Sequence, residues 1–470
     1  MPSRDQLLAT LPENQHHLLG FWDQLTETEQ EALASQLAKI DFDQLGELFK
    51  KAAADSTPWG EIADRASSPP AVTLADLEEG DTIELARKAG EDALRRGEVG
   101  FILVAGGQGT RLGFELPKGM YPIGPLSGRT LFQMMMDLVK ARSEHYGADI
   151  PVYLMTSPAT DADTQRHVAE EKSFGLADDQ LKIFCQGTMP AVDDQSGQCL
   201  LKSKSELFLS PDGHGGLLKA FVESGCLKDT EDRGIKYLFY CQVDNPLAQI
   251  CDPVFIGLHI LNQSNLTSQV VRKTDPLQRV GNVVEVDDRV MIIEYSDLPE
   301  KNARQTADNG ELKFWAGSIA VHVFDVAFLK DVSEQSKADD QLLPFHIAHK
   351  KVPFVDPSGT SVSPEAPNAF KFERFVFDLL PLAKKSIVVE IDPDEGFAAV
   401  KNAPPATTET AETTKAAIVA QHKRWLQEAG VEVAAGVQVE IHPAIAHDAE
   451  AVKAKMPATP AITQDTYFSK

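Results

Sequence analysis

A glycine-rich segment that ends in a lysine, residues 103–118 (LVAGGQGTRLGFELPK), contains the residue types best suited to chemistry in this sequence. Its three glycines would let the backbone approach phosphate oxygens closely and direct N–H groups toward them. Arg111 could add a bidentate hydrogen-bonding fork, and Lys118 a mobile point charge. A strand-like run over residues 99–105 leads into this segment, and ligands of open α/β sheets bind beyond such strand ends. We therefore predict a phosphate-binding loop.

Three other interpretations of this loop compete with the first. A Walker A loop needs a lysine followed by serine or threonine directly after its glycines, and no lysine stands there. A dinucleotide-binding fold needs a carboxylate at the end of its second strand, but the next strand-like run ends in Met155, Thr156 and Ser157. A simple glycine turn explains neither the two cations nor the proline between them. A loop for a nucleoside triphosphate is the interpretation that remains.

The composition limits the partners of the chain. It has 470 residues, of which 43% are hydrophobic and 24% charged, which is a globular composition with enough length for two or three domains. A formal net charge of −25 opposes binding to nucleic acid or anionic membranes, so a phosphate ligand would need a local cationic pocket. The five cysteines form no CxxC pair, and no run approaches about 18 apolar residues. We expect a cytoplasmic protein with reduced thiols, and the oligomeric state stays open.

Short apolar runs alternate with helical patterns in the middle of the chain, which predicts an α/β fold. The strand-like runs cover residues 99–105, 151–157, 181–187 and 235–244. This order is typical of a Rossmann-like, mostly parallel sheet with helices on both faces. Beyond residue 260 the sequence becomes richer in strands, which indicates an antiparallel extension and therefore a mixed sheet.

Three regions are predicted along the sequence. Residues 1–95 form a helical N-terminal region, residues 96–400 the central α/β domain, and residues 401–470 a linker followed by a small C-terminal domain. The linker over residues 402–414 (NAPPATTETAETT) is polar and contains two prolines, so we expect it to be mobile.

The glycine loop and eight further segments resemble a known family. Residues 103–124 are similar to the signature of eukaryotic-type uridylyltransferases, most of all to that of UDP-N-acetylhexosamine pyrophosphorylases. The further segments occur in the family's order and are residues 186–192, 210–221, 240–247, 252–257, 280–286, 292–298, 371–380 and 400–403. Nine segments in the same order make the resemblance far more specific than one loop would be.

The resemblance implies the nucleotide-diphosphosugar transferase sheet and a UTP:sugar-1-phosphate uridylyltransferase activity. In this reaction the sugar phosphate attacks the α-phosphorus of UTP in line and pyrophosphate leaves, without a covalent enzyme intermediate. The protein would position UTP and the sugar 1-phosphate and neutralise charge on the phosphates, with Mg²⁺ (or Mn²⁺) as the cofactor. N-acetylglucosamine 1-phosphate is the sugar substrate that the resemblance favours.

The resemblance also assigns residues to UTP. Arg111, Lys118 and Lys401 would be the catalytic cations on the phosphates, and Gln186 would read the uracil edge, since an amide both donates and accepts hydrogen bonds. Asp244 ends a strand-like run, where its carboxylate could hold the metal; an Asx turn is the alternative. The residues assigned to UTP are Val104, Ala105, Gly106, Gly107, Gly109, Thr110, Lys118, Gln186, Gly213, Asp244 and Lys371.

The residues assigned to the sugar are His214, Gly281, Glu294, Tyr295, Ser318 and Lys401. The family usually carries asparagine where this chain has His214 and Ser318, which leaves glucose 1-phosphate, galactose 1-phosphate or a broad sugar range open. His214 could titrate near neutral pH and contact the sugar, or it could be a packed imidazole. Phe375 and Phe377 could line the sugar pocket or belong to the core.

Other functions remain as alternatives at this point. Within the same class, the protein could be a UDP-glucose or broad-specificity UDP-sugar pyrophosphorylase. Outside the class, it could be a catalytically silent nucleotide-sugar sensor, for which the loss of Arg111, Lys118 or Asp244 would be the sign; all three are present. An NADP oxidoreductase is disfavoured by the missing carboxylate after the second strand.

Overall fold

The computed structural model describes residues 2–54, 58–338, 342–456 and 460–469 of the chain. The chain divides into two compact units, each made of three segments. Unit 1 consists of Met1–Pro58, Gln186–Lys219 and Asp339–Asp378, and unit 2 of Trp59–Cys185, Ala220–Ala338 and Leu379–Lys470. The predicted boundaries at residues 95 and 400 divide the chain along its sequence, and they stay a prediction.

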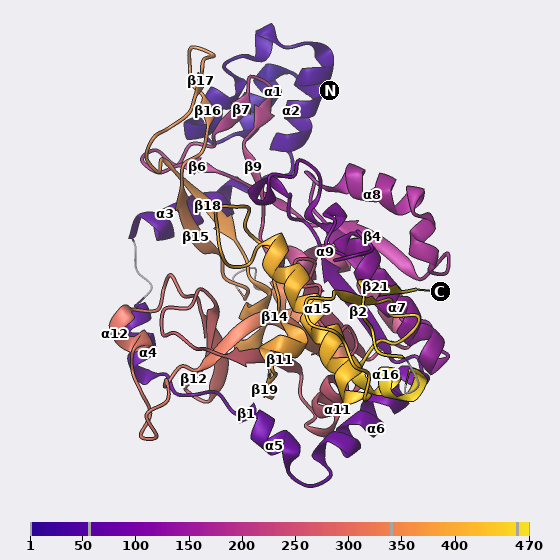
Figure 1. The fold of residues 1–470 in the computed structure, drawn as a ribbon. Coiled ribbons are helices and arrows are strands. Elements are labelled where there is room, and N and C mark those ends of the chain that lie inside the picture. Colours follow the sequence, from indigo (N-terminus) through magenta and orange to yellow (C-terminus); the bar gives the residue numbers. More distant parts are fainter. Residues whose placement is uncertain (1, 55–57, 339–341, 457–459, 470) are drawn as a thin grey trace. The chain divides into compact units, whose positions relative to one another are not determined.

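Unit 2 is built on a ten-stranded sheet (Figure 1). The main path runs in the order β1 (Ala71–Val72), β19 (Ser386–Glu390), β11 (Leu266–Arg272), β14 (Ala316–Asp325), β10 (Tyr237–Gln242), β2 (Val99–Val104), β3 (Val152–Thr156) and β4 (Leu181–Cys185). Neighbouring strands are parallel except for β14, which is antiparallel to both β11 and β10. A hairpin of β12 (Gly281–Val286) and β13 (Arg289–Ile293) extends from β14. The prediction of a mixed, mostly parallel α/β sheet is confirmed.

Local signals in the sequence set the ends of the long helices of unit 2. The helix α7 (Leu131–Tyr146) begins with a capping box between Thr130 and Gln133 and ends at Gly147, whose φ of 70° suits glycine. The helix α11 (Pro253–Leu261) has Asp252 as its N-cap and proline in its first turn. The other helical segments between residues 59 and 396 are α4 (Trp59–Arg65), α5 (Leu74–Glu78), α6 (Thr82–Arg95), η3 (Thr110–Leu112), η4 (Lys118–Met120), α8 (Asp161–Glu170), η5 (Lys172–Gly175), η6 (His214–Gly216), α9 (Leu217–Glu223), α10 (Cys226–Asp232), α12 (Glu300–Ala303), α13 (Val326–Ala338), η7 (Val376–Leu382) and α14 (Pro393–Gly396).

Helices α6 and α11 approach each other closely at two glycines (Figure 1). A Cβ atom at Gly257 of α11 would overlap the carbonyl group of Ala86 in α6, and a Cβ atom at Gly90 of α6 would overlap the carbonyl group of Pro253. The two backbones can pack at this distance only because both positions lack a side chain.

The C-terminal part of unit 2 has a small core of its own. It is shared by α15 (Ala411–Glu428), β20 (Val439–Ile441), α16 (Ala449–Lys455) and β21 (Thr466–Phe468), and the two strands are parallel. The end of the predicted linker over residues 402–414 is helical, and the mobility of the rest stays a prediction. The segment is hydrogen-bonded, since Asn402 pairs with Thr410, and α15 begins at Ala411 with a capping box between Thr410 and Thr413. Two of its five threonines, Thr410 and Thr413, form the capping box of α15.

A buried carboxylate ties this C-terminal part to the loop before α7. Glu440 of β20 is 2% exposed, and its carboxylate accepts hydrogen bonds from the backbone N–H groups of Leu126 and Ser127, both at 2.7 Å, and from the Ser127 hydroxyl at 2.6 Å. Three donors offset the cost of burying the charge. This loop leads from Lys118 to α7, so the C-terminal part supports the segment that follows the glycine loop.

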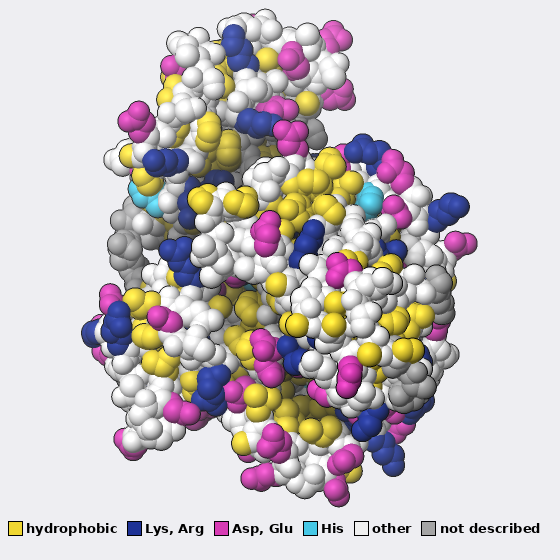
Figure 2. Space-filling model, viewed as in Figure 1, with side chains coloured by type: hydrophobic (Ala, Val, Ile, Leu, Met, Phe, Trp, Pro, Cys, Tyr) yellow, Lys and Arg dark blue, Asp and Glu magenta, His cyan; other side chains and the backbone are white. Residues whose placement is uncertain are grey.

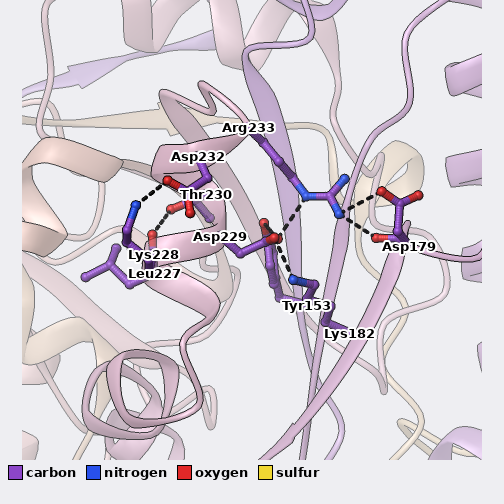
Figure 3. Close-up of polar contacts among 9 residues, drawn as sticks. All are labelled: Tyr153, Asp179, Lys182, Leu227, Lys228, Asp229, Thr230, Asp232 and Arg233. Atoms are coloured by element: carbon purple, nitrogen blue, oxygen red, sulfur yellow. Dashed lines mark hydrogen bonds and ion pairs between the residues drawn. The ribbon is translucent and has the colours of Figure 1, made fainter.

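A second polar cluster, shown in Figure 3, holds α10 against β3 and β4. The Asp229 carboxylate accepts a hydrogen bond from the Tyr153 hydroxyl at 2.8 Å and pairs with Lys182 at 2.5 Å and Arg233 at 2.9 Å. Burial alone would raise the pKa of Asp229, but these donors outweigh burial and lower the pKa. Tyr153 and Lys182 lie near the amino ends of their strands, opposite the edge where such sheets bind ligands, so the cluster has a structural role.

Unit 1 combines the N-terminal helices with small antiparallel sheets. Its first helical segments are α1 (Arg4–Thr10), η1 (Glu13–Leu19), η2 (Trp22–Gln24), α2 (Glu27–Leu37) and α3 (Phe42–Ala54). A three-stranded sheet has the order β15 (His346–Lys350), β18 (Ala369–Glu373), β6 (Val192–Asp193); the strand pairs are β16 (Phe354–Val355) with β17 (Ser361–Val362), β5 (Thr188–Pro190) with β9 (Leu209–Pro211), and β7 (Leu201–Ser203) with β8 (Glu206–Leu207). Helix leucines and sheet residues share one core, which joins three distant segments of the sequence.

Charged side chains of both signs are interspersed over the face shown in Figure 2. The large negative net charge is therefore not gathered into one acidic patch on that face. Within the described ranges, no helix has the combination of length and apolar character that crossing a membrane requires.

The contact between α6 and α11 gives a stability prediction. Gly257→Ala should lower the free energy of unfolding by about 2 kcal/mol or more, because the added methyl group forces the helices apart. Gly46→Ala in α3 is a matched control: no atom lies within 4 Å of a Cβ atom at Gly46, so alanine should be neutral or slightly stabilising there. Thermal unfolding of both variants measures the effect, and equal midpoints would contradict the close packing.

Candidate functional site

The glycine loop leaves β2 and folds back on itself within a few residues. The Ser157 hydroxyl donates to the Gly106 carbonyl at 2.7 Å, and the Lys118 backbone N–H donates to the Gly107 carbonyl at 3.0 Å. Lys118 therefore lies beside the start of the loop, although ten residues separate it from Gly107. The structure thus brings the backbone of Lys118 next to the glycines.

Gly109 and Gly107 differ in whether the surrounding protein requires glycine at their positions. A Cβ atom at Gly109 would lie 2.7 Å from the ring of Phe114, so only glycine fits the tight turn there. A Cβ atom at Gly107 would meet no described atom within 4 Å, so nothing within the protein demands glycine at that position. Open space beside an exposed loop backbone is what the approach of a phosphate would need.

Asp244 and Lys118 form an ion pair in unit 2. The Lys118 ammonium lies 3.2 Å from the Asp244 carboxylate, and the two side chains are only 17% and 13% exposed. Asp244 follows β10, which is parallel to β2, so the two parallel strands end side by side and place their following residues together. Low exposure strengthens this ion pair compared with a surface pair.

The Asx-turn alternative for Asp244 is not supported. Within the described residues its carboxylate accepts a hydrogen bond from Lys118 and from no backbone N–H. The next residue, Asn245, makes the backbone contacts instead: its side chain donates to the Gly396 carbonyl at 2.9 Å and accepts from the Ala398 N–H at 3.0 Å. Asn245 was not singled out in the sequence, and its buried side chain fixes the turn so that the Asp244 carboxylate points elsewhere.

The segment that carries Lys401 lies against the same edge of the sheet. The Val400 N–H donates to the Asp244 carbonyl at 2.8 Å, and the Ala403 N–H donates to the Arg111 carbonyl at 3.1 Å. Lys401 itself pairs with Glu409 at 3.1 Å. The structure thus gathers Arg111, Lys118, Asp244 and Lys401 within unit 2.

The Arg111 side chain differs from the two lysines. It is exposed, and it takes part in no hydrogen bond or ion pair within the described part of the chain. Its charge is therefore available to an anionic ligand at this edge.

The oxygen donors of Asp244 are the type that Mg²⁺ prefers, and the described residues contain no group of three or more His, Cys, Asp or Glu with metal-binding geometry. A single carboxylate suits Mg²⁺, which usually takes its other ligands from phosphates and water.

Three of the predicted sugar residues also converge in unit 2. Gly281 pairs with Ser318 across β12 and β14, and a Cβ atom at Gly281 would lie 3.1 Å from the Glu294 carboxylate. The small size of Gly281 leaves room beside that carboxylate. Tyr295, by contrast, is 48% exposed at the end of this region.

The predicted uracil residues lie together in unit 1. The Gln186 amide donates to the Gly213 carbonyl at 3.5 Å, and Gln186 is almost completely buried. Gly213 has a φ of 82°, and a Cβ atom there would overlap the Arg374 carbonyl, so a larger residue would be strained.

Lys371, a predicted phosphate residue, also belongs to unit 1. It lies on β18 with its ammonium 5.0 Å from the ring centre of Phe208, and burial lowers the pKa of Lys371.

His214 in unit 1 is a packed, neutral imidazole. Its Nδ1 accepts the Val376 N–H at 3.1 Å, and its ring stacks on Phe375 with centroids 5.2 Å apart. Burial, with a smaller effect from the nearby His346, lowers the pKa of His214 to about 4. Because Nδ1 accepts, the single hydrogen of the neutral ring is on Nε2, which makes His214 a hydrogen-bond donor at that atom.

A second histidine also contacts Phe375. His346 stacks on Phe375 at 4.3 Å and pairs with Asp378 at 2.9 Å, and Phe377 lies 5.0 Å from Phe375. Phe375 thus contacts two imidazoles, and the buried Phe377 lies beside it. His346 and Asp378 are 32 residues apart and belong to no short motif, so the sequence offered no signal for this pair.

The chain is similar to proteins of one known family. The UTP–glucose-1-phosphate uridylyltransferase (UDPGP) family matches residues 43–462, and the chain belongs to this family. It is 36% identical over 428 residues to UDP-N-acetylhexosamine pyrophosphorylase-like protein 1 of Xenopus tropicalis, which covers 88% of this chain and 83% of that protein. It is 38% identical over 374 residues to UDP-N-acetylglucosamine pyrophosphorylase of Saccharomyces cerevisiae, with 77% of each chain covered.

Among solved structures, the chain is similar to uridine diphosphate N-acetylglucosamine pyrophosphorylase from Trypanosoma brucei. The TM-score is 0.83 at 25% sequence identity, and the match covers 100% of this chain and 99% of that one. The family resemblance and the nucleotidyltransferase type of fold are confirmed. The individual residue roles remain predictions.

The neutral state of His214 gives a pH prediction. His214→Gln should flatten the dependence of stability on pH, because the folded protein keeps the imidazole neutral down to about pH 4 while the unfolded chain protonates it below about pH 6.5. In the wild type this contribution is complete above pH 6.5 and is lost as the pH falls toward 4, by up to roughly 3 kcal/mol. Urea unfolding between pH 4 and 7 measures it; identical slopes for both proteins would refute the prediction.

Proposed function

We propose that this protein transfers the uridylyl group of UTP to a sugar 1-phosphate, with release of pyrophosphate, and that the sugar is N-acetylglucosamine. The observation that carries the proposal is the glycine loop with its adjacent Lys118–Asp244 pair, in a chain similar over most of its length to proteins named as pyrophosphorylases. A loop with open backbone, cations and one carboxylate at the ends of parallel strands suits a triphosphate.

The reaction needs positioning and charge neutralisation more than it needs a nucleophile from the protein. An oxygen of the sugar phosphate forms a bond to the α-phosphorus of UTP, the bond from that phosphorus to the β-phosphate oxygen breaks, and pyrophosphate leaves. Lys118 is proposed to stabilise the charge at the α-phosphate, Arg111 that on the leaving pyrophosphate, and Lys401 that on the sugar phosphate. Their support is proximity along one edge of the sheet in unit 2.

Asp244 is proposed to hold Mg²⁺ (or Mn²⁺). The metal would supply further neutralisation of the phosphate oxygens. The Asp244 carboxylate already pairs with Lys118, so one group would orient both the lysine and the metal. Its position beside the glycine loop, and the absence of backbone hydrogen bonds to its carboxylate in the described residues, support this role.

The remaining roles rest on the family resemblance. Val104, Ala105, Gly106 and Gly107 are proposed to lie along the uridine and the first phosphate, with Gly109 and Thr110 facing the other phosphates. Gln186 and Gly213 are proposed to contact the uracil, and Lys371 the phosphates. A cytoplasmic location is proposed on composition alone.

The sugar preference depends on two residues that depart from the family's pattern. Glu294 could accept hydrogen bonds from two sugar hydroxyls beside Gly281. Ser318 pairs with Gly281 across β12 and β14, and Tyr295 follows Glu294 in the sequence. His214 donates at Nε2, and both a hydroxyl and an acetamide carbonyl can accept that hydrogen bond. A UDP-glucose or broad UDP-sugar pyrophosphorylase is the second candidate, because the matching family carries the glucose 1-phosphate name.

Pyrophosphate release tests the function. Wild-type protein with UTP and Mg²⁺ should release pyrophosphate with N-acetylglucosamine 1-phosphate at least about tenfold faster, in kcat/KM, than with glucose or galactose 1-phosphate. A preference for glucose or galactose would favour the second candidate, and the double variant His214→Asn, Ser318→Asn should then shift activity toward the N-acetylated sugar. No release with any sugar while UTP still binds would indicate a nucleotide-sugar sensor.

A metal titration tests Asp244. Asp244→Asn keeps the shape of the side chain but removes its charge, so the Mg²⁺ concentration for half-maximal turnover should rise about tenfold or more. Asp178→Asn, at an exposed position, is the matched control and should titrate as the wild type does. An unchanged titration for Asp244→Asn would remove the metal role from this residue.

A further inference from the structure

Glu409 has an unusual backbone conformation for its residue type. Its φ is 53°, in the left-handed region that residues with a side chain seldom occupy. The Glu409 carbonyl accepts the N–H groups of both Lys401 (2.7 Å) and Asn402 (3.0 Å). Conformations of this kind cost about 1–3 kcal/mol each and persist where the surrounding structure holds them, often at functional sites.

The side chain of Glu409 turns back to the same residue that its carbonyl binds. Its carboxylate lies 3.1 Å from the Lys401 ammonium, and the two side chains are 35% and 36% exposed. Glu409 therefore holds Lys401 at two points, the backbone N–H and the ammonium. Neither contact follows from the sequence spacing, because the seven residues between Lys401 and Glu409 form a closed turn rather than a helix or strand.

This turn is attached to the proposed phosphate site on both sides. The residue before Lys401 donates to the Asp244 carbonyl at 2.8 Å, and Ala403 donates to the Arg111 carbonyl at 3.1 Å. After Glu409 the chain enters α15 through its N-cap Thr410, and Thr414 of that helix donates to the Ala399 carbonyl at 3.2 Å. Lys401 is thus anchored relative to the glycine loop and to the end of β10.

We propose that Glu409 is a positioning residue for Lys401, an inference that rests on the proposed phosphate role of Lys401. A lysine side chain has four rotatable bonds and loses about 2 kcal/mol of rotamer entropy when it is fixed. The ion pair fixes it before the substrate arrives and occupies one of the three ammonium hydrogens, which leaves two for phosphate oxygens. The carboxylate and the constrained backbone of Glu409 together aim the ammonium at the site.

A double-mutant cycle in pyrophosphate release separates this role from a structural one. Glu409→Gln keeps the size of the side chain and removes its charge; in the wild-type background it should lower kcat/KM for the sugar 1-phosphate by about fivefold. In the Lys401→Met background the same change should have no effect, since the group that it positions is gone. Glu428→Gln, exposed at the far end of α15, is the matched control and should leave both backgrounds unchanged.

A backbone variant covers the possibility that Glu409 matters only for the turn. Glu409→Gly restores an unstrained left-handed position but lacks the carboxylate, so it should unfold at or above the temperature of Glu409→Ala and yet lose activity as Glu409→Gln does. Full activity in Glu409→Gly would overturn the inference.

The other outcomes also decide the matter. An equal loss from Glu409→Gln in both backgrounds would assign a structural role and overturn the inference, and faster turnover in Glu409→Gln would show that Glu409 competes with the substrate for Lys401. Unchanged activity in Lys401→Met would remove the premise and the inference with it. If the wild-type protein and Glu428→Gln release no pyrophosphate, the proposed function itself fails. That result would be known before any Glu409 variant is compared.

Discussion

The parallel pairing of β2 with β10 is the constraint on which the proposed phosphate site depends. Parallel strands that start at the same edge also end at the same edge, so the residues after β2 and after β10 must lie together. This pairing puts the glycine loop beside Asp244 although about 135 residues of sequence separate them. The segment around Lys401 joins both through backbone hydrogen bonds, so three distant pieces of chain meet at this edge.

An acidic protein that binds a triphosphate must prevent its own carboxylates from repelling the ligand. Here two lysines at the proposed site are each paired with one carboxylate, Lys118 with Asp244 and Lys401 with Glu409. A paired lysine keeps its charge and its orientation, and two of its three hydrogens remain for the ligand. Arg111, exposed beside them, adds a charge that no described group neutralises. The proposed phosphate site therefore combines two lysines that are already held in place with the available guanidinium of Arg111.

The sequence predicted the strand runs and the loop well, and its errors have identifiable causes. Val99–Val104 is continuous apolar sequence followed by glycines, a pattern with few structural alternatives. The start of α15 within residues 402–414 was missed because the capping threonines Thr410 and Thr413 are residues that are also common in linkers. Asn245, His346, Asp378 and Glu409 were missed because each acts through a partner that lies far away in sequence or across a turn, and no local period or motif encodes such a contact.

By itself, the amino-acid sequence determined the class of fold and the location of the glycine loop, because apolar periodicity and glycine spacing are local properties of a chain, and its ordered segments carried the family resemblance. The tertiary structure alone decided which charges meet. It paired Lys118 with Asp244, held Lys401 through Glu409, and buried His214 against Phe375 so that its imidazole stays neutral. Distances between charges, and the burial that sets a pKa, arise only when remote segments pack together, and a linear pattern of residues carries neither.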